Sequence, residues 1–119
     1  MMVKQTFKAT AVFKHNGKKE VIKIVAPAAE TMKNFRSAYH DLINKEKALR
    51  AAPADEDAQE KYGNAVLAAF GVVIGGENLM KLLLLYGRDA GEFVRDVKTY
   101  VVKKALPKLK KMEAKEYRG

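Results

Sequence analysis

The stretch that decides the fold, residues 69–87, reads AFGVVIGGENLMKLLLLYG. Two apolar runs are separated here by Gly75-Gly76 and by the polar residues that follow. A helix that spans a membrane needs about 20 consecutive apolar residues, whereas Glu77 and Lys81 interrupt this stretch with charge. The pattern therefore predicts the end of one helix, a turn, and a short, largely buried helix rather than a membrane span.

The glycine pair also differs from a phosphate-binding loop. Such a loop needs the pattern Gly-x-x-x-x-Gly-Lys-Ser/Thr after a strand. Here Gly76 is followed by Glu77, which repels phosphate, and the preceding residues have a helical pattern. We expect the glycines to end the helix in the left-handed conformation, which costs glycine no Cβ clash.

The beginning of the chain predicts a β-hairpin. Apolar residues alternate with lysine and threonine over residues 3–14, as in a strand with one wet face. Asn16-Gly17 then tolerates the positive φ angles of a two-residue turn. Residues 18–25 return as a second strand, although their apolar side chains fall on both faces. A lone hairpin is marginally stable, so it must pack on helices or pair with another copy of the chain.

Helical periodicity follows from Pro27 to the end of the chain. A long amphipathic helix is expected to about Ala51, where Pro53 ends it. The further helices are expected over residues 54–74, 77–86 and 92–106, with a break or restart at Leu106-Pro107 and a final basic helix or tail. The fold class is therefore α+β, a single domain made of a hairpin (1–26), a helical body (27–105) and a basic C-terminal segment (106–119).

Composition restricts the classes of function. The 119 residues include no cysteine, so disulfides and thiolate metal sites are excluded, and the cytoplasm is the expected location. The net charge of +9 favours contact with anionic partners. Most of this charge lies at the two ends of the chain, and the C-terminal candidates for a basic surface are Lys103, Lys104, Lys108, Lys110 and Lys111.

Groups for catalysis or metal binding are sparse. The two histidines are His15, in the expected turn, and His40, on the first helix, and neither has carboxylates at a metal-ligand spacing. Ser37, His40 and Asp41 share one helix, which offers no oxyanion hole. The sequence therefore predicts a protein that is not an enzyme, with no catalytic residues, no cofactor and no metal site.

Three segments carry a family resemblance: the turn NGKK (16–19), the central stretch FGVVIGG (70–76) and the segment PKLKK (107–111). Together with the order of hairpin and helices, they resemble the tail assembly chaperones and related small tail accessory proteins of bacteriophages. The resemblance implies a non-enzymatic protein that binds the long helical tape measure protein during tail assembly, in the host cytoplasm.

The residues themselves are compatible with a protein partner, because amphipathic helices can form a groove for an apolar helix. Candidate contacts are Phe35, Tyr39, Phe93, Val97 and Tyr100, and the alternative is that all five are ordinary core. The hairpin edge offers a second surface, through which copies of the chain could associate. A small protein that binds nucleic acid through its basic ends remains the alternative function.

Overall fold

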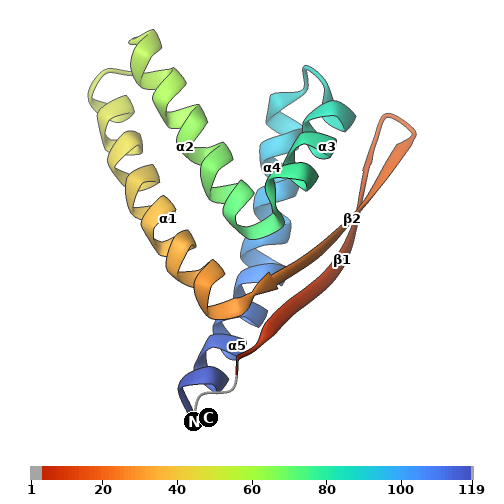
Figure 1. Cartoon of the computed structure of the whole chain (residues 1–119). Coiled ribbons are helices and arrows are strands. Elements are labelled where there is room, and N and C mark those ends of the chain that lie inside the picture. The colour runs from red at the N-terminus through yellow and green to blue at the C-terminus, as the bar shows by residue number, and fades with distance from the viewer. Residues whose placement is uncertain (1–3, 119) are drawn as a thin grey trace.

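An antiparallel hairpin begins the structure, and helices follow it to the C-terminus (Figure 1). The computed structural model describes residues 4–118, so residues 1–3 and 119 of the expected units lie outside it. The elements are β1 (Thr6–His15), β2 (Lys18–Pro27), α1 (Ala28–Ala51), α2 (Glu56–Ile74), α3 (Gly76–Tyr86), α4 (Ala90–Tyr100), a π-helical turn (Val101–Ala105) and α5 (Leu106–Arg118). This arrangement confirms the predicted α+β class.

The hairpin has the predicted two-residue turn. Asn16 and Gly17 both have positive φ, 49° and 76°, which matches the twist of the strands that they join. Val12 pairs with Val21 across the hairpin. The sequence did not show which face of β2 points inward, and the register of the two strands decides this. The inner face of the sheet carries the buried residues Phe7, Phe13, Ile22 and Ile24, whereas Val21 and Val25 are exposed.

Helices α1 and α2 lie antiparallel and form an arm that diverges from α4 (Figure 1). Pro27 was expected in the first turn of the helix, whereas α1 begins one residue later, at Ala28, and Pro27 directly precedes it. The connection carries Pro53, and α2 begins where the Asp55 side chain accepts a 3.0 Å hydrogen bond from the Asp57 backbone N–H. Such a cap satisfies one of the free N–H groups of a helix start.

Gly75 joins α2 to α3 as a single corner residue. Its N–H donates to the Gly71 carbonyl at 2.9 Å, and its own carbonyl accepts from the Leu79 N–H at 3.0 Å. The expected left-handed helical conformation is wrong, because Gly75 has φ 92° and ψ 147°, a region that is almost restricted to glycine. In this conformation the N–H of Gly75 completes the last turn of α2 while its carbonyl accepts the first hydrogen bond of α3.

Asn78 ties this corner to the hairpin. Its side-chain N–H₂ group donates to the Ile74 carbonyl at 2.7 Å and to the Lys23 carbonyl at 2.8 Å. One amide therefore satisfies a carbonyl at the end of α2 and another on the edge of β2. This contact holds α3 against the hairpin.

Of the expected break or restart at Leu106-Pro107, the break is wrong, because the backbone stays helical from α4 into α5, although α5 does begin at Leu106. The π-helical turn lies just before the proline, and within it the Leu106 N–H donates to the Val101 carbonyl, five residues back. Proline in an α-helix lacks a donor and clashes with the carbonyl four residues back. The wider π turn shifts the carbonyls relative to Pro107, so the helix passes this residue without stopping.

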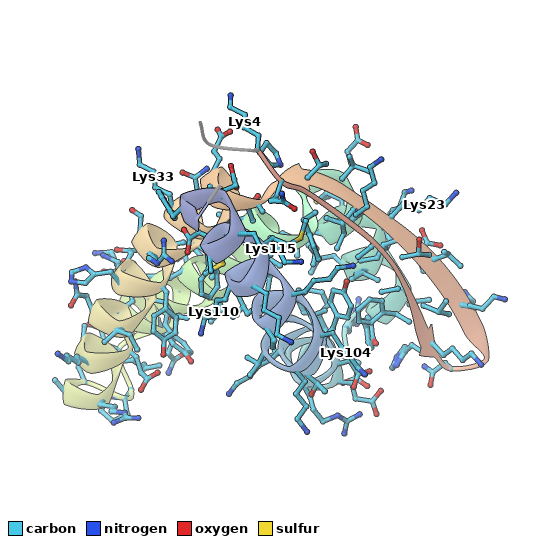
Figure 2. The ribbon with its side chains drawn as sticks, turned by 90° about the horizontal axis from the view of Figure 1, so that it is seen from below. Lys4, Lys23, Lys33, Lys104, Lys110 and Lys115 are labelled. Carbon is cyan, nitrogen blue, oxygen red and sulfur yellow. The ribbon has the colours of Figure 1, made fainter. Side chains whose placement is uncertain are left out.

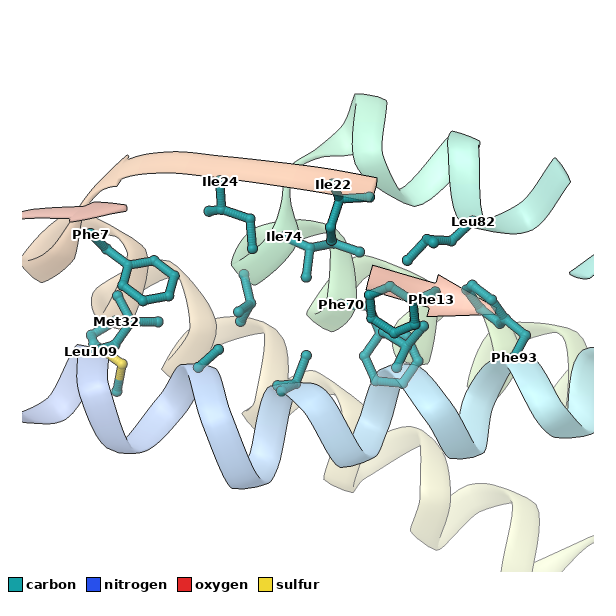
Figure 3. Packing of buried hydrophobic residues seen from close by; sticks show 14 of the residues in the cluster. Phe7, Phe13, Ile22, Ile24, Met32, Phe70, Ile74, Leu82, Phe93 and Leu109 are labelled. Atoms are coloured by element: carbon teal, nitrogen blue, oxygen red, sulfur yellow. The ribbon is translucent and has the colours of Figure 1, made fainter. Parts of the chain in front are cut away.

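The core lies where the inner face of the hairpin meets α3, the C-terminal half of α2 and the continuous α4–α5 helix (Figure 3). From α1 only Ala28 and Met32, near its beginning, are buried in this cluster. The expectation that α3 is largely buried is wrong for Met80 and Leu84, which are exposed, because α3 packs on the body along one face only. Because the buried cluster includes only the beginning of α1 and the end of α2, the distal part of the α1–α2 arm lies outside it.

Candidate functional site: an apolar cleft between two helical arms

An apolar cleft opens between the α1–α2 arm and α4. It consists of two adjoining hollows of about 200 and 420 Å³, which share Tyr62 and Val66 of α2 and Val94 of α4. The smaller hollow is bounded by Phe35 and Tyr39 of α1. The larger one extends toward α3 and is lined mostly by apolar atoms. We call these two hollows together the interarm cleft.

Large apolar side chains in the interarm cleft remain open to solvent. Tyr39 is 48% exposed and Val102 is 52% exposed, although both line its smaller hollow. Phe35 and Tyr39 are stacked with their ring centroids 5.7 Å apart, so the α1 side presents a flat aromatic wall. Concave apolar surface of this kind is typical of a site that buries an apolar partner.

The structure separates the five predicted contact residues into different environments. Phe35 and Tyr39 line the interarm cleft, as a partner site requires. Phe93 lines the larger hollow of the interarm cleft, although it is only 3% exposed. Val97 is 0% exposed and lies in the core, so it is not accessible to a partner. Tyr100 is half-buried and packs edge-to-face on Phe13 of the hairpin, at 5.8 Å between centroids.

Sequence reasoning missed two residues on the α4 side of the interarm cleft. Val94 and Val102 stand beside the core positions on the same helix and face the α1–α2 arm. The signal was the adjacent apolar pairs, Phe93-Val94 and Val101-Val102. Neighbouring residues on a helix point about 100° apart, so such pairs indicate two apolar faces rather than one.

Between residues 103 and 117, the C-terminal part of the chain presents only lysine charge on its outer surface. Its two glutamates, Glu113 and Glu116, are turned inward toward α1. The Ala29 backbone N–H donates to Glu116 Oε2 at 3.2 Å, so this carboxylate binds the beginning of α1. The exposed charged side chains between positions 103 and 117 are all lysines: Lys103, Lys104, Lys108, Lys110, Lys111 and Lys115.

Figure 2 shows Lys104, Lys110 and Lys115 along the helix that ends the chain, and four of the six lysines form a stripe on this helix. Lys104, Lys108, Lys111 and Lys115 follow one another at steps of four, three and four residues, which places them on one face. Lys108 also lies over the hairpin, with its Nζ 5.7 Å from the centre of the Phe7 ring. We call the four residues the lysine stripe.

Arg36 and Glu113 join α1 to α5 by two hydrogen bonds, in one of which Arg36 Nη1 donates to Glu113 Oε2 at 2.8 Å. The bonds to the guanidinium lower the pKa of Glu113 below its ordinary value of 4.5.

A carboxyl group with a lowered pKa in the folded state stabilises the protein above its unfolded pKa. This stabilisation is lost as the pH falls through the folded value. We therefore expect the melting temperature to fall below about pH 4.5, and to fall less steeply in Glu113→Gln. Thermal melts from pH 7 to pH 3 measure this difference, and equal slopes in the two proteins would contradict it.

The polar residues that were weighed for catalysis lie apart from the interarm cleft. Ser37, His40 and Asp41 are exposed on α1. The sequence placed His15 in the turn, and this expectation is wrong, because His15 is the last residue of β1. Its side chain is buried beside the beginning of α4.

Comparison of the chain with models of known families, with curated proteins and with solved structures finds no match. None of the helices within residues 4–118 combines the length and the apolar character needed to cross a membrane.

Proposed function

We propose that the protein is a non-enzymatic binding protein that holds an apolar helical segment of another protein in the interarm cleft. The observation that carries this proposal is the set of exposed and half-buried apolar side chains that α1, α2 and α4 bring to one concave surface. An amphipathic helix lays its apolar face into such a groove through residues spaced by three and four positions.

The partner that this proposal names is the tape measure protein of a bacteriophage tail. The resemblance of the chain to tail assembly chaperones supports this choice, and a tape measure protein presents long apolar helices before the tail tube forms around it. The interarm cleft would shield these helices in the cytoplasm of the host cell. The charged rim residues Glu46 and Lys98 would stay in contact with water.

Co-expression tests this proposal. The partner that the proposal names, a tape measure protein, is produced alone and together with this chain, and its soluble fraction is measured. We expect the tape measure protein to become soluble and to co-purify with the chain. An insoluble tape measure protein in both cases would refute the proposal.

A second candidate function, binding to duplex nucleic acid, is favoured by the lysine stripe. Lysine contacts phosphate as a point charge without reading sequence. Because both glutamates of the segment are turned inward, no exposed carboxylate of residues 103–117 opposes such contact.

If the four lysines of the stripe each contact one phosphate, the logarithm of the affinity should fall with the logarithm of salt concentration with a slope of about −3.6. That slope corresponds to a loss of about 150-fold between about 50 and 200 mM salt. Fluorescence anisotropy with a labelled DNA duplex measures it.

The variant Lys111→Gln should reduce the steepness of this slope by about one. Lys47→Gln, which removes an exposed lysine from the α1–α2 arm, is the matched control and should leave the slope unchanged. Absence of binding at 50 mM salt, or equal slopes in the two variants, would exclude the lysine stripe as a nucleic-acid site.

A further inference from the structure

The hairpin brings a buried histidine against two carboxylates from the beginning of α4. His15 Nδ1 lies 2.8 Å from Glu92 Oε2, and His15 Nε2 lies 3.8 Å from Asp89 Oδ2. One ligand atom from each of the three residues lies within 4.8 Å of the others. Neither spacing in the sequence nor a shared element predicted this cluster, because His15 belongs to β1.

The imidazole of His15 is held in place on several sides. Its side chain is only 6% exposed, and its ring packs on the Tyr86 ring with the centroids 4.7 Å apart. The Tyr86 hydroxyl in turn donates to Asp96 Oδ2 at 2.6 Å. His15 is therefore a pre-oriented ligand, and not a mobile surface side chain.

The two carboxylates have divided roles at the beginning of α4. Asp89 Oδ1 accepts a 3.1 Å hydrogen bond from the Glu92 N–H and caps the helix. Its other oxygen, Oδ2, remains on the side of His15. In a capping box, the Glu92 side chain would reach back to the Asp89 N–H. Instead the Glu92 carboxylate lies at His15 Nδ1.

This geometry matches the surroundings of a metal-binding histidine. In such sites one ring nitrogen binds the metal while the other donates to a carboxylate, which fixes the orientation of the ring. Glu92 is in the position of that carboxylate, and Nε2 faces Asp89 across 3.8 Å, a distance too long for a hydrogen bond. Two ligands bonded to Zn²⁺ at about 2.0–2.1 Å with a tetrahedral angle are about 3.3 Å apart. A shift of about half an ångström in the Asp89 side chain would achieve this separation.

The charge of these three side chains and their access to solvent both favour a divalent cation. A neutral imidazole and two carboxylates carry the charge that balances a divalent cation. Both carboxylate side chains are 43% exposed, so an ion can reach them from solvent. Arg95 is the basic side chain that approaches Glu92, where it would compete with a metal ion. Its Nη2 is 3.9 Å from Glu92 Oε1, and its Nε is directed to Asp96 instead.

We propose that His15 and Asp89 bind a divalent transition-metal ion of the Zn²⁺ type, with Glu92 as the residue that orients His15 and with water in the remaining positions. The bound ion would clasp the tip of the hairpin to the beginning of α4. The proposal is independent of what the interarm cleft binds, because none of the three residues lines that cleft.

Zinc and cobalt titrations of the full chain test the proposal. Isothermal titration with ZnCl₂ should give one ion per chain and a raised melting temperature. With CoCl₂, NMR should show paramagnetic broadening of the His15 ring signals and not of His40, the other histidine. This measurement needs no variant, and it contradicts the proposal if His15 is unaffected at 1 mM metal or if both histidines broaden equally.

Three variants assign the roles. His15→Gln should abolish binding, and Glu92→Gln should weaken it by about 10–100-fold, as the loss of an orienting partner does. Asp89→Asn keeps a good helix cap but removes a charged ligand, so it should weaken binding without unfolding α4. The matched control, His40→Gln, should bind like the original chain. Equal affinity in all four variants would show that the three residues form an ion pair only.

Discussion

Substitution of Phe7 with alanine is expected to lower the free energy of unfolding by about 3–5 kcal/mol. Phe7 is 1% exposed and lies where β1 meets the beginning of α1 and the middle of α5. Figure 3 shows its ring directed toward Met32 and Leu109. The loss of the ring would leave a cavity between β1, α1 and α5, and these three elements cannot all move inward to fill it.

Urea denaturation measures this change, and another residue of the same hairpin offers a matched control. Val25 lies on the outer face of the hairpin with 69% exposure, so Val25→Ala should change stability by no more than about 0.5 kcal/mol. Domains of this size are stable by only about 5–15 kcal/mol, so the Phe7 variant should be close to unfolding at 37 °C. Similar losses in both variants would contradict the observed packing.

The second large effect is expected at the interarm cleft. Val94→Asp should weaken binding of a tape measure helix by at least about 30-fold, the effect of losing a central contact residue. The substitution places a carboxylate where three helices present apolar side chains, and an apolar helix could not satisfy that charge. Because Val94 is 36% exposed, the free protein should remain folded.

Isothermal titration with a peptide from the tape measure protein measures this loss, and circular dichroism checks the fold. Val25→Asp adds the same charge to an exposed valine far from the interarm cleft in the fold, and it should bind normally. If Val25→Asp weakens binding and Val94→Asp does not, the partner uses the outer face of the hairpin instead.

Most of the secondary structure could be predicted because its causes are local. The alternation of residues 3–14 and the Asn16-Gly17 turn indicated the hairpin, and the structure confirms the strand from Thr6 onward and the turn. The spacing of apolar residues and the position of Pro53 indicated α1 and α2, whose bounds agree with the expectation. These signals depend on neighbours within a few positions, so one sequence contains them completely.

The errors fall where a local signal had more than one structural outcome. Pro107 predicted a break, yet a π turn accommodates it. The apolar run of α3 predicted burial on most sides, yet the hairpin and α4 cover only one face. For the candidate site, three of five predicted contacts line the interarm cleft, and Val94 and Val102 were missed. A periodic pattern shows that a helix has an apolar face without showing which element covers it.

The amino-acid pattern was sufficient for the hairpin, for the approximate extents of the helices and for the excess of lysine near both ends, because turn chemistry, periodicity and charge are properties of short segments. The angle between the α1–α2 arm and α4, the inward turn of Glu113 and Glu116, and the meeting of His15 with Asp89 and Glu92 depended on the folded chain. Each of these features joins residues that are distant in sequence. Their contacts form only when burial of the common core brings the hairpin and the helices together.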